Sequence, residues 1–208
     1  MAGLALKLVV GLGNPGAEYA RTRHNAGWWF VDALADQHRG NWKADRKAHT
    51  ETCRIDVDGH ELWLLKPTAF MNRSGGPTQS VAGFYRIQPS EILVVHDELD
   101  LPAGTARLKQ GGGHGGHNGL RDLIAVLGAD FWRLRLGIAH PGDRDQVVDY
   151  VLQRPGREDE QQIEDALKRA LTVFPQLLGA GAQKAMNVLH SAGHAAPANP
   201  GDKKGSKE

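Results

Sequence analysis

The 208-residue sequence has ordinary proportions for a globular protein in water, with 40% hydrophobic and 24% charged residues. Its 25 basic and 24 acidic residues give a formal net charge of +1, which neither requires nor excludes a nucleic-acid partner. Cys53 is the only cysteine, which excludes an internal disulfide and a thiolate metal cage and fits a reducing, cytoplasmic location. We expect neither a signal peptide nor a membrane span, since no apolar run approaches about 18 residues.

Strand and helix patterns interleave along the chain. In order, the predicted elements are a strand at 4–10, a helix at 26–38, a polar loop at 41–47, a hairpin at 51–65, a helix at 79–86, strands at 91–95 and 102–110, a helix at 119–127, a strand at 132–139, an amphipathic helix at 158–178 and a last short helix near Met186. The hairpin, whose turn is Asp58-Gly59, breaks a strict βαβ alternation. We therefore predict an α/β fold, a single globular domain with a mixed twisted β-sheet flanked by helices on both faces.

Polar side chains collect in loops that follow the predicted strands. These loops are 11–27, 66–75, 96–100 and 110–118. In open α/β folds, ligands bind outside the carboxyl ends of the strands. We therefore expect a convergence of five side chains, Asn14, His24, Asn72, Asp97 and Asn118.

Residues 11–16, GLGNPG, match the G-x-G-x-x-G dinucleotide-binding pattern directly after a strand. Pro15 stands where a helix N-terminus would offer backbone N–H groups to a pyrophosphate, and proline has none. The acidic residue that this pattern requires about 20 residues later would be Asp36, which lies inside a predicted helix. These two departures argue against nucleotide binding.

His114 and His117 have a spacing found in some metal sites. They lie in a glycine-rich stretch, 111–119, and not on one face of a helix, and no cysteine or clear carboxylate flanks them. Because too few ligands are present, we expect no metal, and a loop whose glycines let the backbone approach a substrate is the simpler interpretation. A metal-dependent hydrolase that uses these two histidines stays as an alternative.

His24 and Asp97 suit a general base and the carboxylate that orients it. No serine or cysteine has a nucleophile-elbow context, so the nucleophile would be water. Asn14, Asn72 and Asn118 can hold that water and stabilise an oxyanion without carrying charge. Taken singly, Asn14 also suits a turn and Asn118 a helix cap, but their common position after strands favours a functional role.

Basic residues alternate on two predicted strands, as Arg107 and Lys109 and as Arg133 and Arg135. Each pair projects from one face of its strand. Two such pairs can grip a phosphate backbone. A solvated strand face, or charges that protect a sheet edge, would give the same pattern, so the pairs alone do not decide.

Several long motifs together resemble the bacterial peptidyl-tRNA hydrolase family over roughly residues 6–190. The motifs are VVGLGNPGAEYARTRHNAG at 9–27, KPTAFMNRSG at 66–75, ILVVHDELDLP at 92–102, GGGHGGHNGLRD at 111–122, RLRLGIAHPGD at 133–143 and the VVDYVL stretch after it. Motifs of this length in this order are far more specific than any single pattern above. The resemblance implies an enzyme that cleaves the ester between a peptide and tRNA and releases tRNA for reuse in translation.

The resemblance also implies roles in catalysis. His24 would be the general base that activates water, and Asp97 the carboxylate that orients it. Asn14 and Asn72 would bind the peptidyl part and position the water, with Met71 packed beside them.

Other implied roles concern the substrate's anchors. Asn118 would hold a water and the peptide backbone, in a loop that gates the cleft. Tyr19 would contact the acceptor end of tRNA near the ester, and Lys109 and Arg135 would clamp the 5′-phosphate of tRNA. The family implies a monomer with no cofactor and no metal, whose partner is peptidyl-tRNA.

The domain organisation follows from the same motifs and from composition. We predict a catalytic domain over residues 1–190 and a disordered polar tail over 191–208, where little apolar content remains beyond alanine. A second alternative is an RNA-binding protein on this fold that lacks catalysis. The intact set of His24, Asp97 and the asparagines argues against it.

Overall fold

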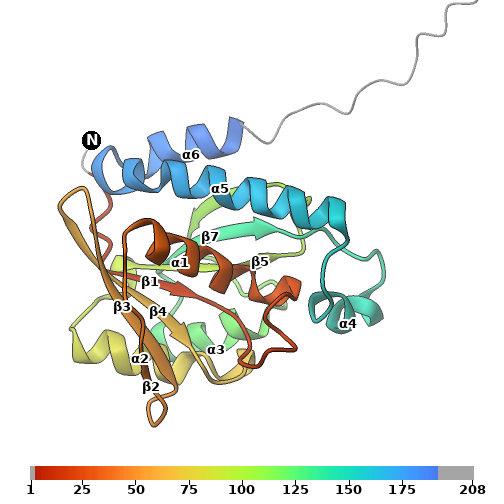
Figure 1. The fold of residues 1–208 in the computed structure, drawn as a ribbon, viewed down its shortest axis with the longest axis horizontal. Coiled ribbons are helices and arrows are strands. Elements are labelled where there is room, and N and C mark those ends of the chain that lie inside the picture. Colours follow the sequence, from red (N-terminus) through yellow and green to blue (C-terminus); the bar gives the residue numbers. More distant parts are fainter. Residues whose placement is uncertain (1–2, 192–208) are drawn as a thin grey trace, which may run out of the picture.

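The computed structural model describes residues 3–191, and a seven-stranded sheet forms the middle of its three layers (Figure 1). The strands are β1 (Leu8–Gly11), β2 (Lys43–Asp45), β3 (Thr50–Val57), β4 (His60–Pro67), β5 (Ile92–Glu98), β6 (Ala106–Gln110) and β7 (Trp132–Gly137), in the order β2-β3-β4-β1-β5-β7-β6. The central strands β4, β1, β5 and β7 are parallel, whereas β2, β3 and β6 join them in antiparallel pairs. The predicted mixed α/β sheet is thus confirmed.

Helices cover both faces of this sheet. They are α1 (Ala26–Gln37), α2 (Gly75–Phe84), α3 (Asn118–Leu127), α4 (Val147–Val151), α5 (Arg157–Gly179) and α6 (Ala182–Ser191). On one face, α1, α5 and α6 bury a core that includes Phe30 and Phe174; on the other, α2 and α3 bury one that includes Leu120 and Leu123. Each core forms because alternate side chains of a strand point to opposite faces of the sheet.

Most predicted elements are present with shifted bounds, but the polar loop predicted at 41–47 is wrong in part. Residues Lys43–Asp45 form strand β2, which pairs antiparallel with β3 at the sheet edge. All three residues are exposed, so the strand carries no apolar alternation that a sequence pattern would detect. The strand predicted at 102–110 begins only at Ala106.

The ends of the described chain bear on two further predictions. The tail predicted at 191–208 lies outside the described residues, apart from Ser191, which ends α6. Among residues 3–191, no helix is both long and apolar enough to cross a membrane.

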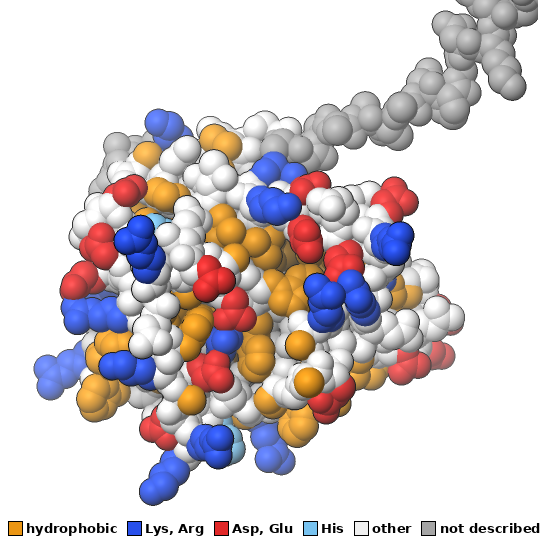
Figure 2. All heavy atoms as spheres, in the orientation of Figure 1, with side chains coloured by type: hydrophobic (Ala, Val, Ile, Leu, Met, Phe, Trp, Pro, Cys, Tyr) orange, Lys and Arg blue, Asp and Glu red, His pale blue; other side chains and the backbone are white. Residues whose placement is uncertain are grey.

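On the face shown in Figure 2, basic and acidic side chains are interspersed, as expected of a chain with a net charge of +1.

A close contact between helix α1 and the sheet positions the loop after β1. Gly11, at the end of β1, and Gly27, in the first turn of α1, face each other, since a Cβ added to Gly11 would lie 2.5 Å from the Gly27 carbonyl oxygen. A Cβ on Gly27 would lie 2.3 Å from the carbonyl oxygen of Val95, in β5. The start of α1 therefore rests directly on the backbone of the two central strands.

This contact generates a stability prediction. We expect Gly27→Ala to lower the free energy of unfolding by about 3 kcal/mol, because the added methyl group meets rigid backbone atoms and overpacks the site. Gly83→Ala, in helix α2, is the matched control, since its Cβ has no neighbour within 4 Å among the described residues. This control should gain about 0.5–1 kcal/mol from helix propensity. Urea unfolding measures both, and equal stability of the two variants would contradict the close contact.

Candidate active site

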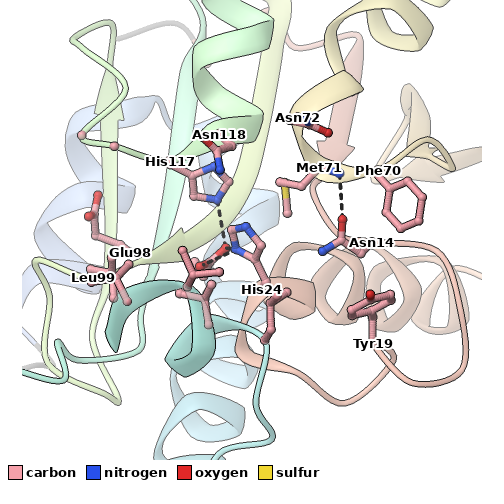
Figure 3. A pocket seen from close by; sticks show the side chains of 17 residues that line it. Asn14, Tyr19, His24, Phe70, Met71, Asn72, Glu98, Leu99, His117 and Asn118 are labelled. Carbon is pink, nitrogen blue, oxygen red and sulfur yellow. Dashed lines mark hydrogen bonds and ion pairs between the residues drawn. The ribbon is translucent and has the colours of Figure 1, made fainter. Parts of the chain in front are cut away.

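A cleft of about 340 Å³ opens at the carboxyl ends of the central strands (Figure 3). Seven of the nine side chains predicted for the site surround it: Asn14, Tyr19, His24, Met71, Asn72, Asp97 and Asn118. The other two, Lys109 and Arg135, lie on β6 and β7 and do not line the cleft. The sequence therefore located the cleft through the loops that follow β1, β4 and β5 and through the start of α3.

The centre of the cleft is the carboxylate of Asp97, which lies near the end of β5 and is only 3% exposed. His24, from the 3-10 turn η1 (Arg23–Asn25) before α1, places its Nδ1 3.0 and 2.9 Å from the two carboxylate oxygens. His117, just before α3, places its Nε2 2.9 Å from Oδ1 of the same carboxylate. One buried charge is thus shared between two imidazoles whose ring centres are 4.9 Å apart.

His117 also caps helix α3, and this fixes its tautomer. Its Nδ1 accepts hydrogen bonds from the backbone N–H groups of Gly119 (3.1 Å) and Leu120 (3.3 Å). An accepting nitrogen carries no proton, so Nε2 holds the hydrogen and donates it to Asp97. The sequence had pointed to Asn118 as the cap of this helix, and this is wrong: Asn118 is the first helical residue, and its Oδ1 instead accepts from Arg121.

His24 has the complementary arrangement. Its Nδ1 donates to Asp97, so its Nε2 carries the lone pair, and that nitrogen makes no hydrogen bond to any described residue. Burial by itself would lower the pKa of His24, but the charge and hydrogen bond of Asp97 outweigh burial and raise this pKa above the ordinary value of 6.5. Nε2 is therefore a strengthened base that faces the cleft.

The neighbouring charges support this assignment. Burial would raise the pKa of the Asp97 carboxyl, but the two imidazoles that donate to it hold that pKa well below its usual range. A third histidine, His96, is fully buried behind them and donates from Nδ1 to the Asp97 carbonyl oxygen (2.7 Å). Burial and the nearby His117 lower the pKa of His96 to about 3, so it stays neutral. Asp97 thus remains ionised, and its negative charge raises the pKa of His24.

Within residues 3–191, the side chains of His24, Asp97 and His117 form a cluster with the composition of a metal site. Their candidate ligand atoms lie within 4.8 Å of one another. The ring nitrogens that face Asp97 already donate to its carboxylate, however. To bind a metal, His117 would have to move its proton to Nδ1 and give up both helix-capping bonds. His114, the partner proposed from the sequence, instead accepts from the Gly116 backbone N–H (3.0 Å). The donor set fits a hydrogen-bonded relay better than a metal site.

Asn14 is held in place by the side chain of Asn25. Asn25 directly precedes helix α1, where asparagine often caps a helix, but its side chain makes no capping bond. It accepts from the Asn14 backbone N–H (2.9 Å) and donates to the Asn14 carbonyl oxygen (3.0 Å) instead. Asn14 Oδ1 in turn accepts from the Met71 backbone N–H (2.7 Å), so the amide nitrogen of Asn14 is the group that faces the cleft.

The remaining walls of the cleft are aromatic and apolar. Phe70, which is 57% exposed, packs edge-on against Tyr19. Across the cleft, short helix α4 contributes Val147, Val148 and Val151, and Val148 is 64% exposed. Phe70 and these valines were missed from the sequence, because an apolar residue in a loop or in a short helix cannot be told from a core residue until the fold is known. They give the cleft an apolar wall beside its amide groups.

Lys109 and Arg135 belong to a separate cationic surface. In the antiparallel β6–β7 ladder, Lys109 is opposite Arg133 and Arg107 is opposite Arg135, so all four side chains share one face. Arg135 is 3.8 Å from the carboxylate of Glu98, a residue that lines the cleft. Like charges directly opposite each other destabilise a sheet unless an anion offsets them. These opposed cations therefore carry an electrostatic cost in the folded protein.

Comparisons with known proteins agree with this geometry. The family model described as "Peptidyl-tRNA hydrolase" matches residues 8–197. The peptidyl-tRNA hydrolase of Neisseria meningitidis serogroup A is 54% identical over 187 residues, which are 89% of this chain and 97% of that protein. The enzyme of Legionella pneumophila strain Lens is 52% identical and is covered over its whole length, with 90% of this chain. A crystal structure of peptidyl-tRNA hydrolase from Acinetobacter baumannii superposes with a TM-score of 0.87 at 45% identity, covering 91% of this chain and 96% of that one.

The shared carboxylate predicts how His24 titrates. In Asp97→Asn, the pKa of His24 should fall below its value in the unmodified protein, because burial remains and the opposing charge is gone. With Asp97 present, the raised pKa makes protonated His24 favour the folded state below about pH 6.5, and this contribution is lost as the pH rises through the raised pKa. NMR titration of the His24 imidazole measures the change. Asp56→Asn, in β3, is the matched control; an unchanged or higher pKa in Asp97→Asn would refute the assignment.

Proposed function

The chain belongs to the peptidyl-tRNA hydrolase family and hydrolyses peptidyl-tRNA, and we propose that His24, held by Asp97, is the general base of this reaction. One observation carries the proposal: Nδ1 of His24 is occupied by a buried carboxylate, and Nε2 is directed at the cleft with its lone pair available. A base must lie in the cleft and have a pKa near the working pH. His24 lies in the cleft, and Asp97 outweighs burial and raises the pKa of His24 above 6.5.

The reaction can be written through these atoms. His24 Nε2 takes a proton from water while the water oxygen bonds to the carbonyl carbon of the ester. The oxyanion that forms is stabilised by the amide N–H groups of Asn14 and Asn72, and the imidazolium is stabilised by Asp97. Collapse of the intermediate breaks the bond to the ribose oxygen, which receives the proton from His24. The products are a free peptide carboxyl group and tRNA that can be used again in translation.

The rest of the cleft supports roles in substrate binding. Met71 packs beside Asn14, and Asn118, at the start of α3, can donate an amide N–H to the peptide backbone. Val147 and Val148 offer an apolar surface to the side chain of the peptide's last residue. For Tyr19 we propose contact with the terminal nucleotide of tRNA beside the ester; its position on the cleft wall supports this role.

The oligomeric state and the cellular location of the enzyme are part of the same proposal. The family resemblance implies a monomer, and we propose that this chain is active as one. A free, buried Cys53 and a substrate made during translation support a cytoplasmic location. Sedimentation at assay concentration tests the first point, and a dimer as the sole active species would contradict it.

The general base is tested by hydrolysis of N-acetyl-aminoacyl-tRNA. We expect His24→Ala to lower kcat by at least about 100-fold, the typical loss when a general base is removed. His60→Ala, at the start of β4, is the control and should keep full activity. EDTA should leave the unmodified enzyme active, since the ring nitrogens of His24 and His117 that face Asp97 already donate to its carboxylate. Unchanged kcat in His24→Ala contradicts the assignment, and activity abolished by EDTA favours a metal mechanism.

A second test concerns the cationic surface, where Lys109 and Arg135 are proposed to clamp the 5′-phosphate of tRNA. Lys109→Ala should raise KM for N-acetyl-aminoacyl-tRNA and reduce the slope of log KM against log salt by about 1, as expected for one lost phosphate contact. Hydrolysis of an N-acetyl-aminoacyl ester of adenosine, which lacks that phosphate, should not change. Lys43→Ala, at the opposite edge of the sheet, is the control. Equal losses on both substrates would contradict the clamp.

A further inference from the structure

Arg133 is a buried cation that lies outside the cleft. It is 3% exposed, and its side chain lies over the ring of Phe131 (4.9 Å from guanidinium carbon to ring centre). The guanidinium donates from Nη1 to the carbonyl oxygen of Gly113 (2.5 Å) and from Nη2 to that of Gly112. Burying a charge is costly unless its donors are paired. Both terminal nitrogens have a carbonyl partner, whereas Nε has no hydrogen-bond partner among the described residues. A planar guanidinium can bond two successive carbonyls in a way that a lysine ammonium cannot.

The two carbonyls belong to the glycine-rich loop, residues 111–117. Four of its glycines, Gly111, Gly112, Gly115 and Gly116, have φ between +55° and +99°. Glycine populates such conformations freely. The only other residues of the loop are two histidines. The loop therefore cannot hold its own position by packing side chains against a core. Contacts from outside must fix it.

The loop is fixed near both ends. Near the start, Arg133 holds the carbonyls of Gly112 and Gly113. At the other end, His117 donates to the Asp97 carboxylate and caps α3, whose first residue is Asn118. We call the two carbonyl contacts of Arg133 the Arg133 anchor. Only about five residues separate this anchor from His117 and Asn118, so a change in it would displace these two residues, which contact Asp97 and line the cleft.

The Arg133 anchor also adjoins the proposed tRNA clamp. Lys109 is directly opposite Arg133 in the β6–β7 ladder, and a Cβ built on Gly112 would lie 2.9 Å from the Lys109 ammonium nitrogen. The clamp lysine thus lies against the same glycine that Arg133 holds. A phosphate bound at Lys109 would offset the repulsion between the two cations.

We infer that Arg133 is a positioning residue for this hydrolase: it ties the glycine-rich loop to the strand face where tRNA is anchored, and so holds His117 and Asn118 in their working positions. This inference rests on the proposed roles of Lys109 and His24. Arg133 does not touch the reacting atoms. It acts through the loop, and its loss displaces the second donor to Asp97.

The experiment compares Arg133→Lys with Arg54→Lys on N-acetyl-aminoacyl-tRNA and on an N-acetyl-aminoacyl ester of adenosine. Both variants keep the charge, but only the first breaks the two carbonyl contacts, since Arg54 lies on β3 and bonds Glu61 instead. We expect Arg133→Lys to lower kcat about tenfold on both substrates, because small misplacements of catalytic groups are costly. The KM for tRNA and its salt dependence should not change. Arg54→Lys should keep kcat.

The pH profile of kcat separates positioning from a general loss of structure. When His117 leaves Asp97, the full carboxylate charge acts on His24, so the acid limb of the profile should move to higher pH in Arg133→Lys. Partial unfolding would lower kcat without moving this limb. Gly112→Ala, which strains a φ of +99° and presses on Lys109, should give the same shift while leaving Arg133 intact.

The outcomes distinguish this inference from the proposals on which it rests. A change in KM for tRNA alone would make Arg133 a simple phosphate ligand, and unchanged kcat on both substrates would remove its role; either result overturns the inference. Failure of His24→Ala or Lys109→Ala to behave as expected would instead refute the base or the clamp. In that case a kcat loss in Arg133→Lys, together with a shifted pH limb, would still support the loop anchor.

Discussion

The buried carboxylate of Asp97 is the constraint on which the site depends. An ionised group that is 3% exposed must be paired, and it is paired by two imidazoles that come from opposite sides of the central strand β5. His24 arrives on the turn before α1, and His117 arrives at the N-terminus of α3. The two layers of helices therefore meet at one charge, and neither can shift without leaving that charge short of a donor.

The two imidazoles differ in function because their second nitrogens have different neighbours. Nδ1 of His117 is taken up by the backbone of α3, so this ring only donates to Asp97. Nε2 of His24 has no such partner among the described residues, so this ring can accept a proton. Two identical side chains on one carboxylate thus become a structural donor and a base. The two rings differ because backbone N–H groups of α3 bond the second nitrogen of His117, whereas no described backbone group bonds that of His24.

The limits of sequence reasoning follow from the same contacts. The mixed sheet was predictable because the hairpin at Asp58-Gly59 breaks the alternation of strands and helices, and the cleft was predictable because polar residues follow strands that end at one edge. The partners of Asn25 and His117 were not predictable. Each residue stands next to a helix start, where capping is the local expectation, and only tertiary packing decides which hydrogen bond forms. Strand β2 escaped detection because all three residues face solvent.

The strand order explains how a small cleft can serve a very large substrate. The cleft lies at the ends of β1, β4 and β5, whereas the cationic surface lies on β7 and β6 at the sheet edge. Neighbouring strands are about 4.8 Å apart, so the sheet holds the cationic surface at a fixed distance from the cleft. Glu98 joins the two regions, since it lines the cleft and lies 3.8 Å from Arg135. The rigid sheet sets the distance between the cleft and the cationic surface, and the glycine-rich loop between them is held by Arg133 near one end and by His117 at the other.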